Sequence, residues 1–583
     1  MKKYIIRNSD KGNNGDITAK LQTVLAECRK NKDEEKNISF EKGEYHFYWE
    51  FAEENKVFAS NTDTVLQPDI RSAINIDGIN NLTIDGCGSE FIMHGRMIAL
   101  RISECDNISL RNFSWDFPTA GTFQMDVTNV GRHYADYYIP KSLQWKIEKG
   151  NIRWFEKSIL TDKEYWHAIG QNDSHCVVGY NSYTGNVSRY PLTKGPLAHK
   201  CRIRQTGENT LRIYYIKPVD KTLYSDNMSF ELCPSYKRLC TGAFLSESSN
   251  ISLENISVHY MHGFAFLVQM CENISFGGCN FTPKDGSDRN CTSFADHIHV
   301  SGAKGKIHIE NCRFSNAHDD PINIHGTFTR VKKALGSNTL ILEYVHNQQN
   351  GFQQYHKGDK VIFYNRENLS SYGDEMQFTV SEVVNPMSDG LSAKEMKVVF
   401  EEDLPEEIKV PEAFAVENVT YTPEVYIGGC IFEKIPTRGI LCTTRKKVLI
   451  ENNVFDGMTM ASIYLSNDCN DWYESGAIRD MTIRNNKFYI KKSPHKGAKS
   501  AVFIDPIVAK RDKVVLPVHK NITITDNEIY LEDDKAVIAK YTDNLNISNN
   551  KISFSSDYES DKSDVFAIEN CSNVTLLDNH INE

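Results

Sequence analysis

The sequence predicts an all-β fold: a parallel β-helix that carries two inserted β-rich subdomains and an N-terminal capping helix. Three observations lead to this prediction. First, one short strand-like template recurs between residues 81 and 581. Second, neighbouring copies follow one another at the length of one solenoid coil. Third, two long regions interrupt the repeat and show the alternation of β-hairpins instead.

The repeated template consists of alternating aliphatic residues, a polar pair rich in Asn or Gly, and then an aromatic or aliphatic residue. Alternation with a period of two residues indicates a β-strand, and Asn and Gly tolerate the left-handed backbone of a turn. Neighbouring copies begin 23 residues (250 to 273) to 33 residues (447 to 480) apart, which suits one coil of a parallel β-helix. Clear copies are NISLENISV (250–258), NISFGGCNF (273–281), KIHIENCRF (306–314), EVYIGGCIF (424–432), KVLIENNVF (447–455), DMTIRNNKF (480–488) and NITITDNEI (521–529).

This pattern divides the chain into five segments. In the first segment, NGDITAKLQTVLAECRK (14–30) predicts an amphipathic helix that closes the open end of the solenoid, and Asp16 is suited to be its N-cap. The two interruptions are predicted to be small barrels or sandwiches beside the solenoid. The segments are 1–117 (cap and first coils), 118–245 (first insertion), 246–330 (central coils with the candidate catalytic acids), 331–418 (second insertion) and 419–583 (C-terminal coils).

Composition argues against several classes of protein. The formal net charge of −11 opposes nucleic-acid binding, which needs an excess of Lys and Arg. No apolar run approaches the ~18 residues that a membrane span requires. The fifteen cysteines are scattered without a C-x-x-C pair, so neither a disulfide framework nor a structural zinc site is predicted. Cysteines beside strand-like runs are expected to be small buried residues: Cys271, Cys279, Cys312 and Cys430.

The N-terminus leaves localisation and assembly open. MKKYIIRNSDKGNNGD has only three adjacent apolar residues, too few for the apolar region of a signal peptide. We therefore expect either a cytoplasmic protein or a secreted or periplasmic one whose leader preceded this numbering. No pattern indicates the oligomeric state.

Two similar motifs carry the candidate chemistry: DHIHVSG (296–302) and DPINIHG (320–326). Their isoleucines, Ile298 and Ile322, are 24 residues apart. Because this is one coil, the two motifs are predicted to lie directly above one another.

The stacking of these motifs predicts a column of charged residues. Asp296 should lie on Asp320 at the inter-strand spacing of about 4.8 Å, with Arg438 one coil further along. Two stacked carboxylates repel each other, and an arginine beside them favours their ionised forms. Asp319 falls one residue off the column, and it can reach solvent beside Asp320 only if the chain turns there, which Pro321 favours.

Three carboxylates within two coils suit glycoside hydrolysis. One carboxylic acid must protonate the leaving oxygen, while another carboxylate activates water or attacks the sugar. Asp319 is expected to be the acid, and Asp296 with Asp320 the water-activating side. In an inverting enzyme the two sides stand roughly 6.5–9.5 Å apart. The alternative is that the Asp-Asp pair only caps a turn on a solvated face.

Polar and aromatic side chains near these acids are candidate sugar-binding residues. Trp472 offers an aromatic platform with Glu474 beside it, in a segment expected to bulge outward with Tyr473 exposed and Arg479 nearby. The alternative for Trp472 is packing over the flank of the solenoid. The remaining candidates are Arg438, His297, His299, His318, Asn323 and His325.

The alternative function of these histidines is to bind zinc. The candidate ligands are His297, His299, His308, His318 and His325. Strand alternation sets His308 on a separate ladder, and zinc needs at least a third ligand beyond an H-x-H pair. Strand histidines more often hydrogen-bond substrate or neighbours. The sequence therefore predicts no metal and no cofactor.

Five stretches also carry a family resemblance: FEKGEYHF (40–47), GSEFIMHGRMI (88–98), FADHIHVSG (294–302), NAHDDPINIHGT (316–327) and DWYESG (471–476). Through them, nearly the whole chain resembles glycoside hydrolase family 110, the exo-acting α-1,3-galactosidases of bacteria. The resemblance implies a right-handed parallel β-helix with β-barrel insertions. It also implies metal-independent, inverting removal of terminal α-linked galactose, with the catalytic aspartates at Asp296, Asp319 and Asp320.

The resemblance leaves the substrate partly open. Family members act on the branched blood-group B determinant or on linear α-1,3-digalactose, and no residue here separates the two. Two other functions also fit a β-helix: carbohydrate binding without catalysis, and a polysaccharide lyase or uronan hydrolase. A lyase acting on uronic acids usually needs a basic cleft, so a single column arginine and a net charge of −11 favour a neutral sugar.

Overall fold

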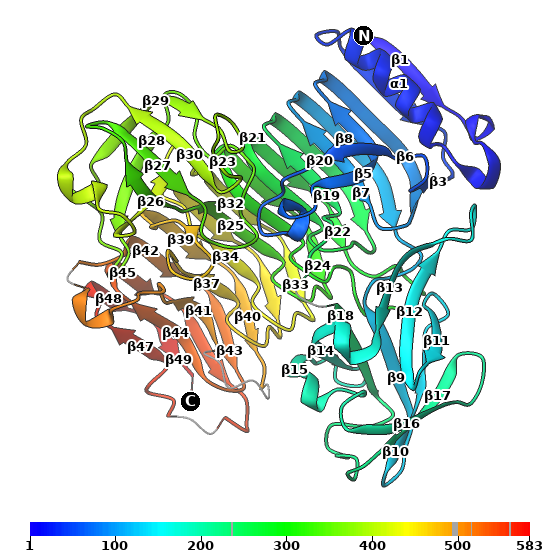
Figure 1. Ribbon diagram of the computed structural model, residues 1–583. Helices are drawn as coiled ribbons and strands as arrows, with labels where there is room; N and C mark the ends of the chain where they lie inside the picture. Colours follow the sequence, from blue (N-terminus) through cyan, green and yellow to red (C-terminus); the bar gives the residue numbers. More distant parts are fainter. Residues whose placement is uncertain (235–236, 493–498, 515, 559–560, 583) are drawn as a thin grey trace.

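The computed structural model describes residues 1–234, 237–492, 499–514, 516–558 and 561–582. A long solenoid of stacked coils carries two β-rich insertions on its sides (Figure 1). The coil strands form one 33-stranded arrangement whose pairings along the stack are almost all parallel, and the insertions form separate sheets. The predicted parallel β-helix is therefore confirmed.

The N-terminal coils are closed by the helix α1 (Thr18–Lys30), which buries Leu21, Val24 and Leu25. The predicted capping helix is thus present. Its N-cap residue is Ile17 rather than Asp16, although the Asp16 carboxylate accepts a hydrogen bond from the Thr18 hydroxyl at 2.7 Å. The strands of this part are β1 (Lys2–Ile6), β2 (Lys36–Phe40), β3 (Glu44–Tyr48), β4 (Glu53–Lys56), β5 (Asp69–Asp77), β6 (Asn80–His94), β7 (Ile98–Ser103) and β8 (Asp106–Asp116).

The first insertion consists of two antiparallel sheets. A seven-stranded sheet has the order β15-β14-β18-β9-β10-β17-β16, and a three-stranded sheet has the order β11-β12-β13. The strands are β9 (Phe123–Val130), β10 (Tyr134–Tyr138), β11 (Gln144–Glu148), β12 (Asn151–Lys157), β13 (Glu164–Ile169), β14 (Ser174–Asn181), β15 (Val187–Pro191), β16 (Lys200–Gln205), β17 (Thr210–Tyr215) and β18 (Met228–Pro234).

The second insertion is a closed six-stranded barrel. It has its own apolar core, which includes Val331, Phe363, Phe378 and Met396. Its strands are β26 (Thr329–Ala334), β27 (Thr339–Glu343), β28 (Lys360–Asn365), β29 (Gln377–Val384), β30 (Glu395–Phe400) and β31 (Phe414–Asn418).

The central and C-terminal coils continue the solenoid past both insertions. Their strands are β19 (Ala243–Ser246), β20 (Ser249–Val258), β21 (Phe266–Gly277), β22 (Asn280–Phe281), β23 (Ile298–Glu310), β24 (Arg313–Ser315), β25 (Ile322–Thr327), β32 (Glu424–Gly428), β33 (Ile431–Glu433), β34 (Ile440–Cys442), β35 (Lys447–Glu451), β36 (Val454–Asp456), β37 (Ile463–Leu465), β38 (Glu474–Ser475), β39 (Asp480–Arg484), β40 (Lys487–Ile490), β41 (Ser500–Ile504), β42 (His519–Thr525), β43 (Glu528–Leu531), β44 (Lys535–Lys540), β45 (Thr542–Ser548), β46 (Lys551–Phe554), β47 (Phe566–Glu569), β48 (Ser572–Leu577) and β49 (His580–Ile581).

The last position of the sequence template builds an aromatic column inside the coils. The rings of Phe281, Phe314, Phe432, Phe455 and Phe488 stack in succession, with centroids 4.7 to 5.0 Å apart and interplanar angles of 10° or less. Each ring fills the coil interior against the ring above, so this column and the aliphatic ladders fix the vertical register of the coils.

The polar pair of the template serves two purposes. Asn452 and Asn485 have φ values of 57° and 55°, the left-handed turn that the sequence predicted. The next residue of each pair, Asn453 or Asn486, is buried instead. The Asn453 side-chain nitrogen donates to the Asn486 side-chain oxygen at 3.0 Å. Asn527, Asn550 and Asn579 extend this ladder, so each turn is hydrogen-bonded to the next.

All fifteen cysteines are free thiols, in agreement with the prediction of no disulfide framework. Cys271, Cys279, Cys312 and Cys430 are buried, as expected. None of the helices in the described part of the chain is long and apolar enough to cross a bilayer.

Candidate active site

The predicted vertical registry of the central coils is present. Ile298 pairs with Ile322, Ile322 with Ile440, and Ile440 with Ile463 on successive parallel strands. Since the charged residues lie two positions before these isoleucines, Asp296, Asp320 and Arg438 follow one another at one corner of the stack. The sequence alignment of the three coils is therefore correct.

Asp320 forms a two-pronged ion pair with Arg438. The Arg438 Nε donates to Asp320 Oδ1 at 3.1 Å and Nη2 donates to Oδ2 at 2.8 Å. The Arg438 backbone N–H adds a third hydrogen bond to Oδ1 at 3.1 Å. The Asp320 side chain is 3% exposed, so Arg438 supplies most of the polar surroundings that water would otherwise give this carboxylate.

Asp296 is held from the opposite side by a chain of histidines. Its Oδ2 lies 2.7 Å from His299 Nδ1, and His299 Nε2 lies 3.1 Å from His325 Nε2. His325 Nδ1 lies 2.7 Å from the Gly326 carbonyl oxygen, which orients the His325 ring. His325 does not reach the cavity, but it supports His299 and contacts Glu474 Oε1 at 3.4 Å.

Asp319 leaves the column, as predicted, because the chain bends at residues 318–319. Two arginines from the first insertion and the segment after it flank its carboxylate. Arg238 Nη2 donates to Asp319 Oδ2 at 3.2 Å, and Arg189 Nη2 lies 3.7 Å from Oδ1. With a side-chain exposure of 21%, Asp319 is the most accessible of the three acids.

The three carboxyl groups form one electrostatic cluster. One oxygen from each lies within 4.8 Å of the other two. Burial and the charge of Asp319 raise the pKa of Asp296 well above its usual range. Burial also raises the pKa of Asp320, to about 7, against the opposing effect of Arg438. For Asp319, burial is outweighed by Arg189 and Arg238, which lower its pKa. Within the cluster, protonation is therefore favoured on Asp296 and Asp320 over Asp319.

These side chains line a cavity of about 200 Å³, smaller than the roughly 300–1,000 Å³ of pockets for drug-sized ligands. Most of the lining side chains are polar or charged, and Tyr464 and Trp472 add aromatic rings, a composition that suits a hydroxyl-rich ring. The lining residues are Arg189, Arg238, Asp296, His299, Asp319, Asp320, Asn323, Arg438, Leu441, Thr443, Tyr464, Ser466, Asn467, Asp468, Trp472, Glu474 and Ile507.

The segment after β37 supplies Trp472 and Glu474 to this wall, as the sequence suggested. Asp468 shapes the segment, because its carboxylate accepts hydrogen bonds from the backbone N–H groups of Asn470 and Trp472 at 2.8 and 2.7 Å. Trp472 is 37% exposed, and the guanidinium of Arg238 lies 5.7 Å from its ring centroid. An indole held open at the edge of a polar cavity is suited to stack on a sugar.

Glu474 joins three distant parts of the chain at the cavity. Its Oε1 accepts a hydrogen bond from Asn61 Nδ2 at 3.0 Å, across 413 residues of sequence. Its Oε2 lies 3.5 Å from Asn323 Nδ2. Both Asn323 and Glu474 therefore belong to the cavity wall.

Five of the sequence expectations are wrong in their geometry. His325, described above, supports His299 and does not line the cavity. His318 points away from the cavity to Glu231, 2.5 Å from its Oε2. Tyr473 is 2% exposed rather than exposed, and its hydroxyl accepts a hydrogen bond from Arg366. Arg479 pairs with Glu375 outside the cavity. His297 is also misplaced, for a different reason.

His297 lies inside the aromatic column. It is fully buried, with ring centroids 5.2 Å from Phe281 and 5.8 Å from Phe314. Neither ring nitrogen has a hydrogen-bond partner among the described residues, and burial lowers its pKa to about 3. The expectation failed because β23 begins only at Ile298. At the corner before it, two successive side chains turn inward.

Replacing His297 with Phe is expected to leave activity unchanged and to raise the free energy of unfolding by about 1–3 kcal/mol. The reason is that the variant removes two buried nitrogens that lack partners. Thermal unfolding and a galactose-release assay measure both effects. His299→Phe is the control, because it removes the partner of Asp296 and should abolish activity. If His297→Phe lost activity while it remained folded, His297 would have to contribute to the active site.

The five histidines considered as zinc ligands do not gather. Only His299 and His325 approach each other, with Glu474 as the third neighbour. His308 faces outward on another ladder, 3.2 Å from Glu310. The arginines at Asp319 were missed, because nothing local in the sequence links residues 189 and 238 to residue 319.

Two protein-family models match parts of this chain. The right-handed β-helix region model matches residues 413–583, and the GLAA-B β-barrel domain II model matches residues 339–413. The helix is therefore right-handed, as the resemblance implied.

Curated relatives align along nearly the whole chain. Alpha-1,3-galactosidase A of Bacteroides thetaiotaomicron is 34% identical over 531 residues, covering 90% of this chain and 87% of the relative. Alpha-1,3-galactosidase A of Streptomyces avermitilis is 32% identical over 567 residues, covering 94% and 87%. Alpha-1,3-galactosidase B of Bacteroides fragilis is 31% identical over 591 residues, covering 98% and 94%. The chain belongs to the family of the alpha-1,3-galactosidases A and B.

Proposed function

We propose that this protein is an exo-acting glycoside hydrolase of the family 110 type that removes terminal α-1,3-linked galactose from glycans. One observation carries the proposal: Asp296, Asp319 and Asp320 meet in a cavity of about 200 Å³, in a chain whose relatives are named alpha-1,3-galactosidases. The size of the cavity supports binding of one terminal galactose rather than an internal segment of a polymer.

We assign the proton-donating role to Asp319. It is the most exposed of the three acids, and the leaving group of an exo-acting enzyme departs toward solvent. The two arginines beside Asp319 favour its ionised form, so it must receive a proton before it can act. Asp296 and Asp320 are the favoured holders of that proton in the free protein. One oxygen of each lies within 4.8 Å of an oxygen of Asp319. Transfer within the cluster leaves a carboxylate on the buried side to activate water.

We further propose that the anomeric configuration inverts. The resemblance to family 110 supports inversion, as does the pairing of Asp296 with Asp320, since two buried carboxyls can hold one water between them. The contact within 4.8 Å is shorter than the roughly 6.5–9.5 Å typical of inverting pairs. Separation alone therefore does not support inversion, and stereochemistry has to be measured directly.

The decisive experiment is proton NMR of the first product formed from an α-1,3-digalactoside. We expect β-galactose to appear first and to mutarotate later to the α anomer. Addition of EDTA should leave the initial rate unchanged, because three arginines already balance the carboxylates. A branched blood-group B trisaccharide in parallel would define the accepted substrate.

Other outcomes of the same experiment contradict parts of the proposal. Initial α-galactose would require retention and a covalent intermediate. Binding of the digalactoside without release of galactose would make the protein a carbohydrate-binding β-helix. Loss of activity with EDTA would bring a metal to the acidic cluster.

A further inference from the structure

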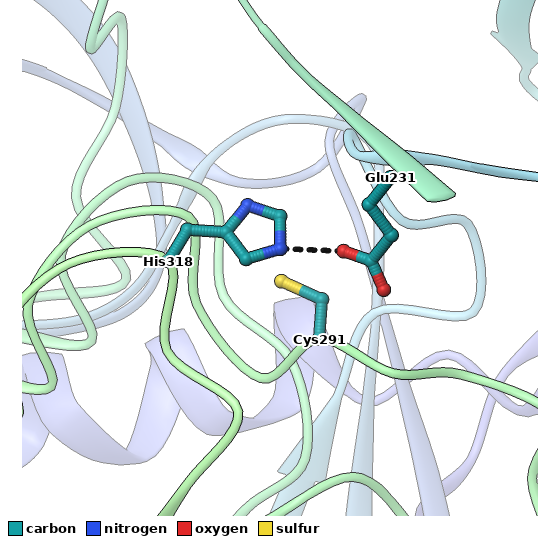
Figure 2. A group of neighbouring side chains, drawn as sticks. All are labelled: Glu231, Cys291 and His318. Atoms are coloured by element: carbon teal, nitrogen blue, oxygen red, sulfur yellow. Dashed lines mark hydrogen bonds and ion pairs between the residues drawn. The ribbon is translucent and has the colours of Figure 1, made fainter. Parts of the chain in front are cut away.

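A second cluster of ionisable side chains lies directly behind Asp319, where the first insertion meets the solenoid. Glu231, Cys291 and His318 converge there (Figure 2), and each is 2% exposed. His318 Nε2 lies 2.5 Å from Glu231 Oε2, and its Nδ1 lies 3.0 Å from the sulfur of Cys233. Both nitrogens of this buried imidazole therefore have hydrogen-bond partners.

Glu231 and His318 contact each other directly, with no room for a zinc ion between them in this arrangement. Two ligands of one tetrahedral zinc ion, each about 2.0–2.1 Å from it, stand more than about 3 Å apart. The contact between Glu231 and His318 is direct and shorter than that. Burial opposes a charge on His318, but Cys291 and Glu231 raise its pKa well above the usual range. The raised pKa of His318 favours its charged form, beside Glu231 at 2.5 Å.

Glu231 reaches His318 from an ordered position in the insertion. It stands on β18, where it pairs with Val178 of β14, and Val178 pairs with Arg189 of β15. Residues on one rung of a sheet point to the same face. Glu231 and Arg189 are thus projected together from one face of the seven-stranded sheet toward the bend at residues 318–319.

Both side chains hold that bend. Glu231 binds the His318 ring, and Arg189 Nη2 donates to the His318 carbonyl oxygen while lying 3.7 Å from the Asp319 carboxylate. On the solenoid side, the His318 backbone N–H donates to the Ser293 carbonyl at 2.8 Å. The backbone of His318, which precedes Asp319, is therefore held at both its carbonyl and its N–H.

We propose that Glu231 and His318 are positioning residues that act through Asp319, so that the first insertion sets the geometry of proton delivery to the leaving group. This inference depends on the function proposed above. It assigns to the inserted sheet a role in the chemical step beyond lining the cavity.

The test is Glu231→Gln in the full-length protein, assayed on two substrates with different needs for an acid. Hydrolysis of an α-1,3-digalactoside needs a proton on the leaving oxygen, whereas α-galactosyl fluoride departs as fluoride without one. Because a misplaced catalytic group costs on the order of 10–100-fold, kcat on the digalactoside should fall by about that factor. KM for the digalactoside and kcat on the fluoride should stay within about threefold.

Asp116→Asn is the matched control. It breaks another buried ion pair, between Asp116 and Arg289 at 2.5 Å, with side-chain exposures of 8% and 7%. It should lower thermal stability without changing the ratio of kcat on the digalactoside to kcat on the fluoride. His318→Asn is the second positioning variant, for use if Glu231→Gln folds poorly. It should likewise lose kcat on the digalactoside and keep kcat on the fluoride.

The outcomes separate this inference from the proposed function. The positioning role would be overturned if both variants lost kcat equally on the two substrates, or lost none on either. The proposed function would be untouched by that result, because it depends on the activity of the wild-type protein. Absence of galactose release by the wild-type protein would overturn the function itself.

Discussion

Asp319→Asn is expected to lower kcat/KM for an α-1,3-digalactoside by about 10²–10⁴-fold, the usual contribution of a general acid. Asparagine keeps the shape of the side chain and can still accept hydrogen bonds from Arg238 and Arg189. Binding of galactose should therefore persist. Hydrolysis of α-galactosyl fluoride should stay within about tenfold of the wild-type rate, because fluoride needs no proton to leave.

Asp296→Asn is the informative counterpart to this variant. If Asp296 belongs to the water-activating side, its replacement should abolish hydrolysis of both substrates. The opposite pattern, with the fluoride still cleaved by Asp296→Asn and not by Asp319→Asn, would transfer the acid role to Asp296. The high proton affinity of Asp296 in the free protein makes this comparison essential.

Arg438→Met is expected to lower activity by at least about 100-fold and to destabilise the protein by about 3–5 kcal/mol at pH 8. Removing one partner of a buried pair leaves the other charge uncompensated. Burial raises the pKa of Asp320 and Arg438 opposes that rise, so that the pKa stands at about 7. Without Arg438 this pKa should rise further, and the carboxylate needed for water activation is lost.

The stability defect of Arg438→Met should depend on pH in a defined direction. The pKa of Asp320 is higher in the folded than in the unfolded chain, so its protonated form favours the folded state, and this stabilisation is lost as pH rises toward the folded pKa. At pH 5 the neutral carboxyl needs no partner, and the difference in melting temperature from wild type should be small. At pH 8 the difference should be largest.

Arg289→Met is the control for this pH dependence. It breaks the Arg289–Asp116 pair outside the cavity and should lower stability while activity remains. A defect in Arg438→Met that is equal at pH 5 and pH 8 would contradict the assigned role of Asp320.

The fold was predictable because its determinants are local and periodic. The spacing between Ile298 and Ile322 was enough to align two coils, and the same periodicity led across the second insertion to Ile440. One regular feature was still missed. The Asn pairs were assigned to turns, whereas only the first Asn is in the left-handed turn and the second, such as Asn486, builds the buried ladder.

The candidate site was only partly predictable, because periodicity describes strands and not the corners or contacts between them. His297 lies at a corner, where alternation does not yet apply, and it turned inward. Arg189 and Arg238 reach Asp319 because of how the first insertion docks on the coils, and no local pattern encodes that docking. The sequence therefore predicted Asp319 as a candidate catalytic residue but could not predict the arginines that surround it.

The hydrogen bond between Asn61 and Glu474 has a consequence for synthesis of the protein. All three aspartates leave the ribosome long before Glu474 does, and the coils behind them can already stack. A nascent chain, or a fragment that ends between Asp320 and Trp472, would carry the acids but lack the wall with Trp472 and Glu474. We therefore expect hydrolytic competence to arise late in translation and to be lost by cleavage well downstream of the acids.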